Sequence, residues 1–306
     1  MVDNLIGSPV VSGVDGSAPA LNAARWAAGE ASTRRAPLLL AYAVATRVRR
    51  AGGGFELAED YQNALESEGR GFMAEAAEQI TAAHPDLSVR TEVRVGDALS
   101  VLTELSARAR LVALGARGLG GFSGMLAGST AAGLVAHGHA PVAVVRGRTV
   151  DAQPPTTGAV VVGVDGSAAG EAAVALAFAA SSVRRAELVA VHTWVEFASD
   201  SAYAYARQFI VDWAAAERYE EELLADGLAG WQEQYPDVAV RRVLTRDRPL
   251  RQLLAHAADA QLLVVGSRGH RRIAGRLLGS TSQALIYHSP CPLLVARPNT
   301  ATEEPR

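Results

Sequence analysis

The sequence contains no lysine; all 29 of its basic residues are arginine. This absence excludes every mechanism that needs a lysine side chain. A Walker-type phosphate loop and a pyridoxal Schiff base both require one, and so does the usual site of a phospho-acceptor receiver domain. Any phosphate group must therefore be bound by backbone N–H groups and a helix start, with arginine as the only strongly basic supplement.

Cysteine, net charge and long apolar runs are also scarce. The single Cys291 cannot form an internal disulfide, and a chain without disulfides suits a reducing cytoplasm. The formal net charge of −3 gives no overall attraction to nucleic acid or to anionic membranes. No apolar run approaches the roughly 18 residues that a membrane span needs, and the N-terminus lacks the pattern of a signal peptide. We therefore expect a cytoplasmic protein with no membrane span and no nucleic-acid partner.

The chain instead contains one pattern twice. VVSGVDGS at 10–17 recurs as VVVGVDGS at 160–167, and GARGLGGFSGMLAGST at 115–130 recurs as GSRGHRRIAGRLLGST at 266–281. A repeat this long indicates two whole domains rather than a solenoid. We expect the first domain at 1–147, a Pro-containing linker at 148–157, the second domain at 158–298 and a tail at 299–306.

Each copy alternates short aliphatic runs with helical patterns. This alternation predicts an α/β fold in which each repeat forms a five-stranded parallel sheet, doubly wound with helices on both faces, as in Rossmann-like domains. Strands are predicted near 10–14, 38–44, 88–95, 111–115 and 141–146, and again near 160–164, 187–194, 238–244, 262–266 and 292–297. Helices are predicted at 20–35, 61–83, 99–108 and 129–137, with a long one at 203–235, whereas 45–60 is predicted to be a loop.

The glycine-rich segments have the spacing Gly-x2-Gly-x9-Gly-Ser-Thr and follow the fourth strand of each copy. Asp15 and Asp165 follow the first strand. In open parallel sheets, ligands bind beyond the carboxyl ends of the strands, and a flexible turn that ends at a helix N-terminus can hold phosphate with backbone N–H groups. The sequence therefore predicts one phosphate-binding crevice in each domain.

These motifs, together with the final strands PVAVVR and PLLVAR, resemble the universal stress protein family in its tandem two-domain form. The resemblance covers nearly the whole chain, twice. It implies a cytoplasmic stress protein that binds ATP and whose nucleotide occupancy sets its conformation or its partners. It also implies an internal pseudo-dimer formed through the last strands of the two domains. A homodimer of chains and a regulatory protein partner are further expectations.

The resemblance further implies an ATP site in each domain, with Mg²⁺ bridging the phosphates and no dedicated set of protein metal ligands. In this arrangement an aspartate accepts a hydrogen bond from the ribose, and the glycine segment holds the phosphates. At the first site the implied residues are Gly13, Val14, Asp15, Ala43, Gly115, Arg117, Gly118, Gly128, Ser129 and Thr130. At the second site they are Gly163, Val164, Asp165, Thr193, Gly266, Arg268, Gly269, Gly279, Ser280 and Thr281.

No catalytic set is present in the sequence: it has neither a supported Ser-His-Asp arrangement, nor paired catalytic carboxylates, nor a Cys/His cluster. Any ATP hydrolysis is therefore expected to be weak. A slow ATPase of the same fold and a nucleotide-independent interaction scaffold remain as alternatives. Asp15 has a competing interpretation as a helix cap.

The two copies also differ. The second glycine segment carries Arg268 and three further arginines where the first has only Arg117, and these either supplement the phosphate charge or form a solvated face. Asp247-Arg248-Pro249 replaces Gly96-Asp97-Ala98, which predicts a second pocket of different shape.

Other conspicuous side chains have structural interpretations. We expect His192 to be a hydrogen-bonded core residue and Cys291 to be structural. Trp213 and Trp231 are expected to pack in the core or an interface. His139 and His288 are expected in surface turns.

Overall fold

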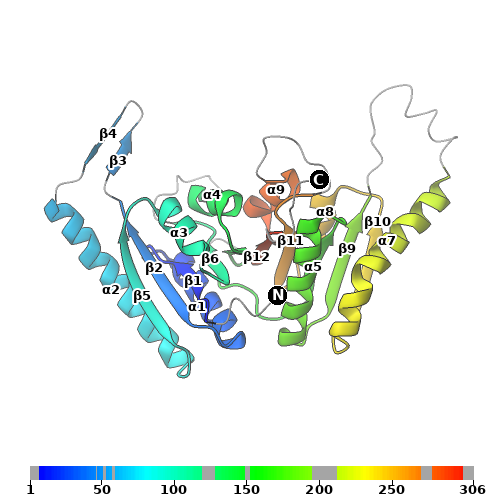
Figure 1. The fold of residues 1–306 in the computed structure, drawn as a ribbon, viewed down its shortest axis with the longest axis horizontal. Coiled ribbons are helices and arrows are strands. Elements are labelled where there is room, and N and C mark those ends of the chain that lie inside the picture. Colours follow the sequence, from blue (N-terminus) through cyan, green and yellow to red (C-terminus); the bar gives the residue numbers. More distant parts are fainter. Residues whose placement is uncertain are drawn as a thin grey trace. The chain divides into compact units, whose positions relative to one another are not determined.

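The structure is a computed structural model that describes residues 7–45, 47–50, 53–56, 59–118, 128–148, 152–194, 212–269 and 278–298 (Figure 1). It contains two compact units. The first comprises 1–155 with 286–295, and the second comprises 156–285 with 296–306. Both units are built from alternating strands and helices, which confirms the predicted tandem α/β fold.

The first unit contains a five-stranded parallel sheet. Its strands lie in the order β5-β2-β1-β6-β7. The strands are β1 (Val10–Gly13), β2 (Leu38–Val44), β5 (Val89–Val95), β6 (Leu111–Gly115) and β7 (Val142–Val145). Because successive strands first extend to one side of β1 and then to the other, the order reverses between β1 and β6. A reversal of this kind opens a crevice beyond the carboxyl ends of the two strands.

Four helices connect these strands: α1 (Ala18–Thr33), α2 (Glu59–Ala83), α3 (Ala98–Ser106) and α4 (Ser129–His137). Helix α1 packs against α2 and α3 packs against α4, and the two pairs lie on different sides of the sheet (Figure 1). Val10, Val11 and Val112 are fully buried between these layers. Burial on both faces explains why the central strands have continuous aliphatic sequences rather than alternating ones.

One prediction for this unit was wrong. Residues 45–60 were expected to form a loop, but β3 (Arg47–Arg50) and β4 (Gly53–Glu56) pair as an antiparallel hairpin. The run of glycines suggested an irregular segment. Gly53 and Gly54 instead lie in β4, opposite Arg50 and Arg49, although glycine is depleted in strands.

The second unit repeats the frame. Its four strands are parallel and lie in the order β10-β9-β8-β11. They are β8 (Val160–Val164), β9 (Leu188–Thr193), β10 (Val240–Thr245) and β11 (Leu262–Gly266). The helices are α5 (Ala168–Arg184), α7 (Trp213–Gln234), α8 (Pro249–Ala257) and the first part of α9 (Ser280–His288), whose residues 286–288 belong to the first unit. Helix α7 begins at Trp213 because Asp212 caps it, accepting a hydrogen bond from Ala215 N at 3.0 Å. The earlier part of the predicted helix, 203–211, lies outside the described residues.

The last strand of the chain, β12 (Leu293–Ala296), pairs antiparallel with β7. Leu293 lies opposite Val144, and Val295 lies opposite Val142. Pro141 and Pro292 precede the paired segments and so do not remove hydrogen bonds from them. The pairing predicted for these two final strands is therefore present.

Candidate functional site

A cavity of about 270 Å³ lies at the carboxyl ends of the strands that flank the reversal point of the first unit. All ten residues expected at the first site line it: Gly13, Val14, Asp15, Ala43, Gly115, Arg117, Gly118, Gly128, Ser129 and Thr130. Eight further residues complete the lining: Ala20, Ala41, Tyr42, Ala98, Val101, Leu102, Leu114 and Ala131. The parallel topology thus gathers segments more than a hundred residues apart into one pocket.

The cavity has an apolar part, built by β2 and α3. Ala41, Val101 and Leu102 line it, and each is buried. Tyr42 adds a ring with a polar tip. Burial, followed by the nearby Glu68 and Asp15 carboxylates, raises the pKa of Tyr42, so its hydroxyl stays neutral. This part of the cavity suits a planar apolar group.

The start of helix α4 supplies a polar, electropositive part. Ser17 and Asp97 cap α1 and α3 with their side chains, whereas the N-cap of α4 is Gly128, which makes no such bond. The first N–H groups of α4 are therefore not used by a capping side chain. Gly128 N donates to Ala116 O at 2.8 Å, which holds the helix start beside Arg117. The helix dipole and a guanidinium both favour an anion here.

Asp15 lies in the cavity wall and is oriented by Ser17. Its Oδ1 accepts hydrogen bonds from Ser17 N at 3.0 Å and from Ser17 Oγ at 2.6 Å, and Ser17 Oγ in turn accepts from Ala20 N at 3.3 Å. Asp15 therefore fixes the capping residue rather than capping α1 itself. The other carboxylate oxygen, Oδ2, faces Gly118, where any Cβ would overlap it. Glycine is needed at this position because the carboxylate occupies the space.

The second unit reproduces this frame. Asp165 Oδ1 accepts from Ser167 N at 3.0 Å and from Ser167 Oγ at 2.7 Å. A Cβ on Gly269 would lie 2.8 Å from Asp165 Oδ2. Gly279 N donates to Ser267 O at 2.9 Å, which places the start of α9 against the glycine segment. The expected second-site residues lie at or next to the ends of β8, β9 and β11 and at the start of α9, as their counterparts lie at or next to the ends of β1, β2 and β6 and at the start of α4.

A family model described as the universal stress protein family matches the chain twice, at residues 8–146 and 157–297. The chain belongs to the universal stress protein family. A universal stress protein of Mycobacterium tuberculosis (strain H37Rv) is 36% identical over 294 residues, which cover 94% of this chain and 96% of the relative. One from Mycobacterium bovis is 38% identical over 291 residues, with the same two coverages of 94% and 96%.

A solved structure shares the fold of the whole chain. The crystal structure of a universal stress protein from Archaeoglobus fulgidus matches with a TM-score of 0.68 at 18% identity, covering 96% of this chain and 99% of that one. These matches confirm the family and the tandem fold that the repeated motifs predicted. Among the helices that the structure describes, none is both long and apolar enough to cross a membrane.

The second unit of this universal stress protein differs from the first at two places that correspond to the lining of the first cavity. His192 takes the strand position of Tyr42; its Nδ1 lies 2.7 Å from Val164 O and its Nε2 lies 2.7 Å from Glu220 Oε2. Helix α8 begins at Pro249 after Arg248, which makes no side-chain capping bond. The second of these differences lies in the Asp247-Arg248-Pro249 segment, for which the sequence predicts a pocket of different shape; this stays a prediction.

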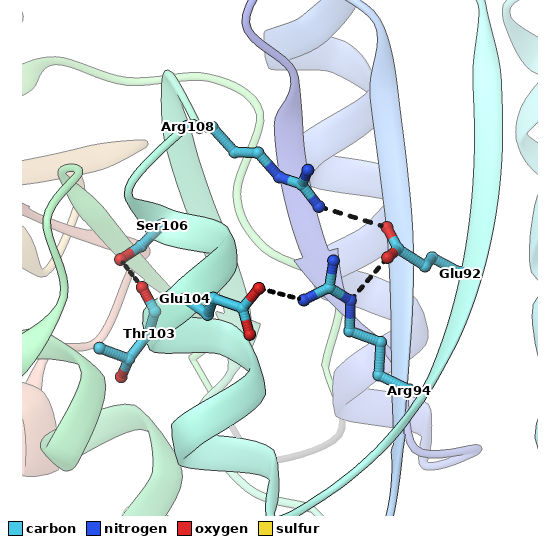
Figure 2. A network of polar contacts seen from close by, with 6 residues as sticks. All are labelled: Glu92, Arg94, Thr103, Glu104, Ser106 and Arg108. Atoms are coloured by element: carbon cyan, nitrogen blue, oxygen red, sulfur yellow. Dashed lines mark hydrogen bonds and ion pairs between the residues drawn. The ribbon is translucent and has the colours of Figure 1, made fainter.

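The wall formed by α3 in the first unit is tied to the edge strand β5 by a polar network (Figure 2). Arg94 bonds Glu92 at 2.6 Å and Glu104 at 2.7 Å, and Arg108 lies 3.8 Å from Glu92. Exposed ion pairs contribute only about 0–1 kcal/mol each. The network therefore fixes the position of α3 more than it stabilises the fold.

Of the side chains with expected structural roles, His192 and Cys291 are buried as predicted, whereas Trp213 and Trp231 are half-buried. His192 is buried with both ring nitrogens bonded, and Cys291 is buried beside Ser289. Trp231 stacks on Phe178, with ring centroids 6.5 Å apart. Trp213 lies under the Arg246 guanidinium, 3.8 Å from the ring centroid. His139 and His288 are exposed. Among the residues described, no three His, Cys, Asp or Glu side chains form a metal-binding group.

Sequence reasoning missed the α3 wall and Tyr42. The signal for the wall was the Gly96-Asp97-Ala98 turn, since Asp97 caps α3 and so fixes where Val101 and Leu102 point. The signal for Tyr42 was a single polar-tipped ring in an otherwise aliphatic strand.

Proposed function

We propose that this universal stress protein binds ATP in the cavity of its first unit and acts as a nucleotide-dependent regulator or sensor in the stress response. One observation carries the proposal: a single cavity joins an apolar part to the open, glycine-capped start of α4, with a carboxylate in its wall. An adenine, a ribose and a polyphosphate need these three environments in turn.

In this proposal the adenine borders Val14 and Ala43, and the ribose bonds Asp15. The phosphates lie against Gly128, Ser129 and Thr130, whose N–H groups begin α4. Each of these residues lines the cavity. Asp15 favours a hydroxyl donor over a phosphate because two negative groups repel each other.

The residues at this site offer few ligands for a Mg²⁺ ion. Among the described residues that line the cavity, Asp15 is the one carboxylate, and Ser129 and Thr130 add hydroxyls. Mg²⁺ commonly keeps several waters and takes one or two carboxylates beside substrate phosphates. These residues would hold it only together with the phosphates of ATP, where its charge offsets their repulsion from Asp15.

The remaining parts of the proposal rest on family resemblance. They are a second ATP in the second unit, a cytoplasmic location, an internal pseudo-dimer, a possible homodimer of chains and an unidentified regulatory protein partner. The repeated aspartate, glycine and helix-start geometry supports the second site.

A charge placed at the start of α4 tests the proposal. Ser129→Glu is favourable for the helix, because an acidic residue suits a helix N-terminus, but it opposes phosphate binding. We expect ATP affinity at the first site to fall at least about tenfold, whereas adenosine affinity stays close to that of the wild type. Titration calorimetry measures both, and Ser280→Glu is the matched change in the second unit.

Ala214→Glu is the control, since it adds the same charge to the first turn of α7 at an exposed position outside the cavity lining. The proposal fails if mass spectrometry and calorimetry show that purified wild-type protein neither carries nor takes up ATP. It also fails if Ser129→Glu binds ATP as the wild type does.

Slow ATP hydrolysis and a nucleotide-independent scaffold are the alternatives, and no specific observation favours either. The Asp15 carboxylate is held by Ser17 at Oδ1, which orients it and does not mark it as a base. Multiple turnovers lost in the Asp15→Ala, Asp165→Ala double variant would favour the ATPase. Partner binding that survives Gly118→Ala with Gly269→Ala would favour the scaffold.

A further inference from the structure

Two arginines follow neighbouring strand ends in the first unit. Gly115 of β6 pairs in register with Val145 of β7, and Ala116 N donates to Val145 O at 3.0 Å. The next residues along the two chains, Arg117 and Arg146, are thereby brought close together. Arg117 lines the cavity, whereas Arg146 is half-buried and does not belong to the lining.

Arg146 is anchored by a helix end. Its Nη1 lies 2.8 Å from Tyr287 O and 3.5 Å from Ile286 O, two carbonyls in the last turn of α9. Terminal carbonyls of a helix have no partner within the helix, and the helix dipole favours a cation there. Burial, and then the nearby Arg117 charge, lower the pKa of Arg146, but an arginine remains protonated in proteins. The cavity therefore has a fixed positive charge directly behind Arg117.

Arg117 itself is short of partners. Its Nε is buried and has no hydrogen-bond partner among the residues described. A buried N–H of a charged group is costly unless something accepts its proton. Gly128 N bonds Ala116 O at 2.8 Å, so the start of α4 adds positive potential at the same place. Two cations and a helix N-terminus together call for a ligand with several negative charges.

We propose that Arg146 is a positioning residue that holds the Arg117 guanidinium toward the cavity and thereby makes the first site selective for nucleoside di- and triphosphates over nucleosides. Arg146 does this through its charge, since it repels Arg117 from the β7 side, while the α9 carbonyls keep Arg146 itself in place. The inference rests on the proposed nucleotide binding and adds which ligand class the site prefers and why.

The second unit contains the same pair at matching positions. Ser267 N donates to Ala296 O at 2.9 Å, and Arg268 and Arg297 follow these residues. Burial, and then the nearby Arg268 charge, lower the pKa of Arg297. The arrangement therefore occurs twice, each time beside a glycine segment that leads to a helix start. It also provides a matched control for each variant.

The test compares ATP and adenosine affinities in a Ser280→Glu background, which opposes phosphate binding at the second site. We expect Arg146→Gln to weaken ATP binding about tenfold and to leave adenosine affinity within about twofold. Arg146→Lys keeps the charge and is expected to keep the ratio of the two affinities. Arg117→Gln should lower the ratio of ATP affinity to adenosine affinity as Arg146→Gln does. The double variant should lower this ratio no further, because Arg146 acts through Arg117.

The outcomes separate the two proposals. A background protein that binds no ATP overturns the nucleotide-binding function itself. If it binds ATP but Arg146→Gln changes both affinities equally, or neither, Arg146 is structural and the positioning role is wrong. Thermal unfolding of each variant reports any loss of the α9 contact separately. If Arg146→Gln does not fold, Arg117→Gln decides, because it leaves the α9 contact intact and must still weaken ATP binding more than adenosine binding; equal or unchanged affinities overturn the positioning role. Arg297→Gln should leave the first site unchanged.

Discussion

Replacing Gly118 by alanine should weaken ATP binding without harming the fold. The backbone at Gly118 is not in the left-handed region, so alanine adopts it without strain, but the new Cβ would overlap Asp15 Oδ2. Asp15 can relieve the overlap only by turning, and its Oδ1 is held by two hydrogen bonds from Ser17, at 3.0 and 2.6 Å. The turn therefore removes the carboxylate from the ribose position that we propose for it.

The loss of one hydrogen bond to a charged group is worth about 1.5–3 kcal/mol, which corresponds to ATP binding weaker by about 10- to 150-fold. Gly269→Ala should cost less at the second site, because its Cβ would lie 2.8 Å from Asp165 Oδ2 and a smaller movement relieves the contact. Titration calorimetry with ATP, together with a chemical denaturation curve for each variant, measures both quantities.

Gly71→Ala is the control, since a Cβ there meets nothing within 4 Å. Removing a glycine from an exposed helix position should stabilise α2 by up to about 1 kcal/mol and leave ATP binding unchanged. A Gly118→Ala protein that folds and binds ATP as tightly as the wild type would refute the reasoning, because Asp15 would then not need its present position.

Two further predictions concern stability. Asp97→Ala should lower the free energy of unfolding by about 1 kcal/mol, because Asp97 Oδ1 accepts from Ser100 N at 3.0 Å to cap α3. The hydrogen bonds from Ser100 hold the pKa of Asp97 below its ordinary value of 3.8. The stabilisation by this cap is therefore present above about pH 3.8 and disappears as the pH falls through the lower folded-state pKa. If the unfolding free energies of the wild type and Asp97→Ala differ by the same amount at every pH, the prediction is wrong. Glu220→Ala should lower the free energy of unfolding by about 1–3 kcal/mol, because it leaves the buried His192 Nε2 without a hydrogen-bond partner. Glu220→Gln should lower it less, since the glutamine amide can donate to that nitrogen. Equal losses of unfolding free energy for the two variants in urea titrations would argue against the pair.

The sequence predicted best the elements in which the hydrophobic pattern along the chain matches the burial of the residues in the fold. The strands at Leu38–Val44 and Leu111–Gly115 match the structure at both ends, because a run of aliphatic residues buried on both faces has a clear start and stop. Helix Ser129–His137 also matches, since it begins after a glycine and ends before Gly138. The β3–β4 hairpin could not be predicted with the same rules, because Gly53 and Gly54 lie within β4 and glycine is depleted in strands.

The candidate site was predictable to the extent that topology alone creates it. Parallel strands bring their carboxyl ends to one edge, so Asp15 and the glycine segment had to converge once the strand order was right. The wall at Val101 and Leu102 depends on where α3 packs, and Arg146 depends on its register beside Arg117 and on carbonyls 140 and 141 residues away in sequence. Such contacts arise from tertiary packing, which no local spacing encodes.

The described parts of the two units differ where the base would lie and agree at the aspartate and at the helix start. In the first, α2 approaches the ring of Tyr42 so closely that any Cβ on Gly69 would overlap it. Glu220 of α7 instead reaches His192, the strand counterpart of Tyr42. The first unit thus packs an aromatic ring, Tyr42, on Gly69, whereas the second unit has the polar pair His192 and Glu220. The strand residue and the helix residue differ together, because each arrangement requires both of its residues.

The aspartate, the glycine contacts and the arginine pair, by contrast, recur with nearly the same hydrogen bonds in both units. His192 Nδ1 already bonds the carbonyl oxygen of Val164 at 2.7 Å, and Val14, the counterpart of Val164, lines the first cavity. A base that used this carbonyl in the first unit would meet competition from an imidazole in the second. The two sites should therefore share their preference for phosphate and differ in their affinity for the base.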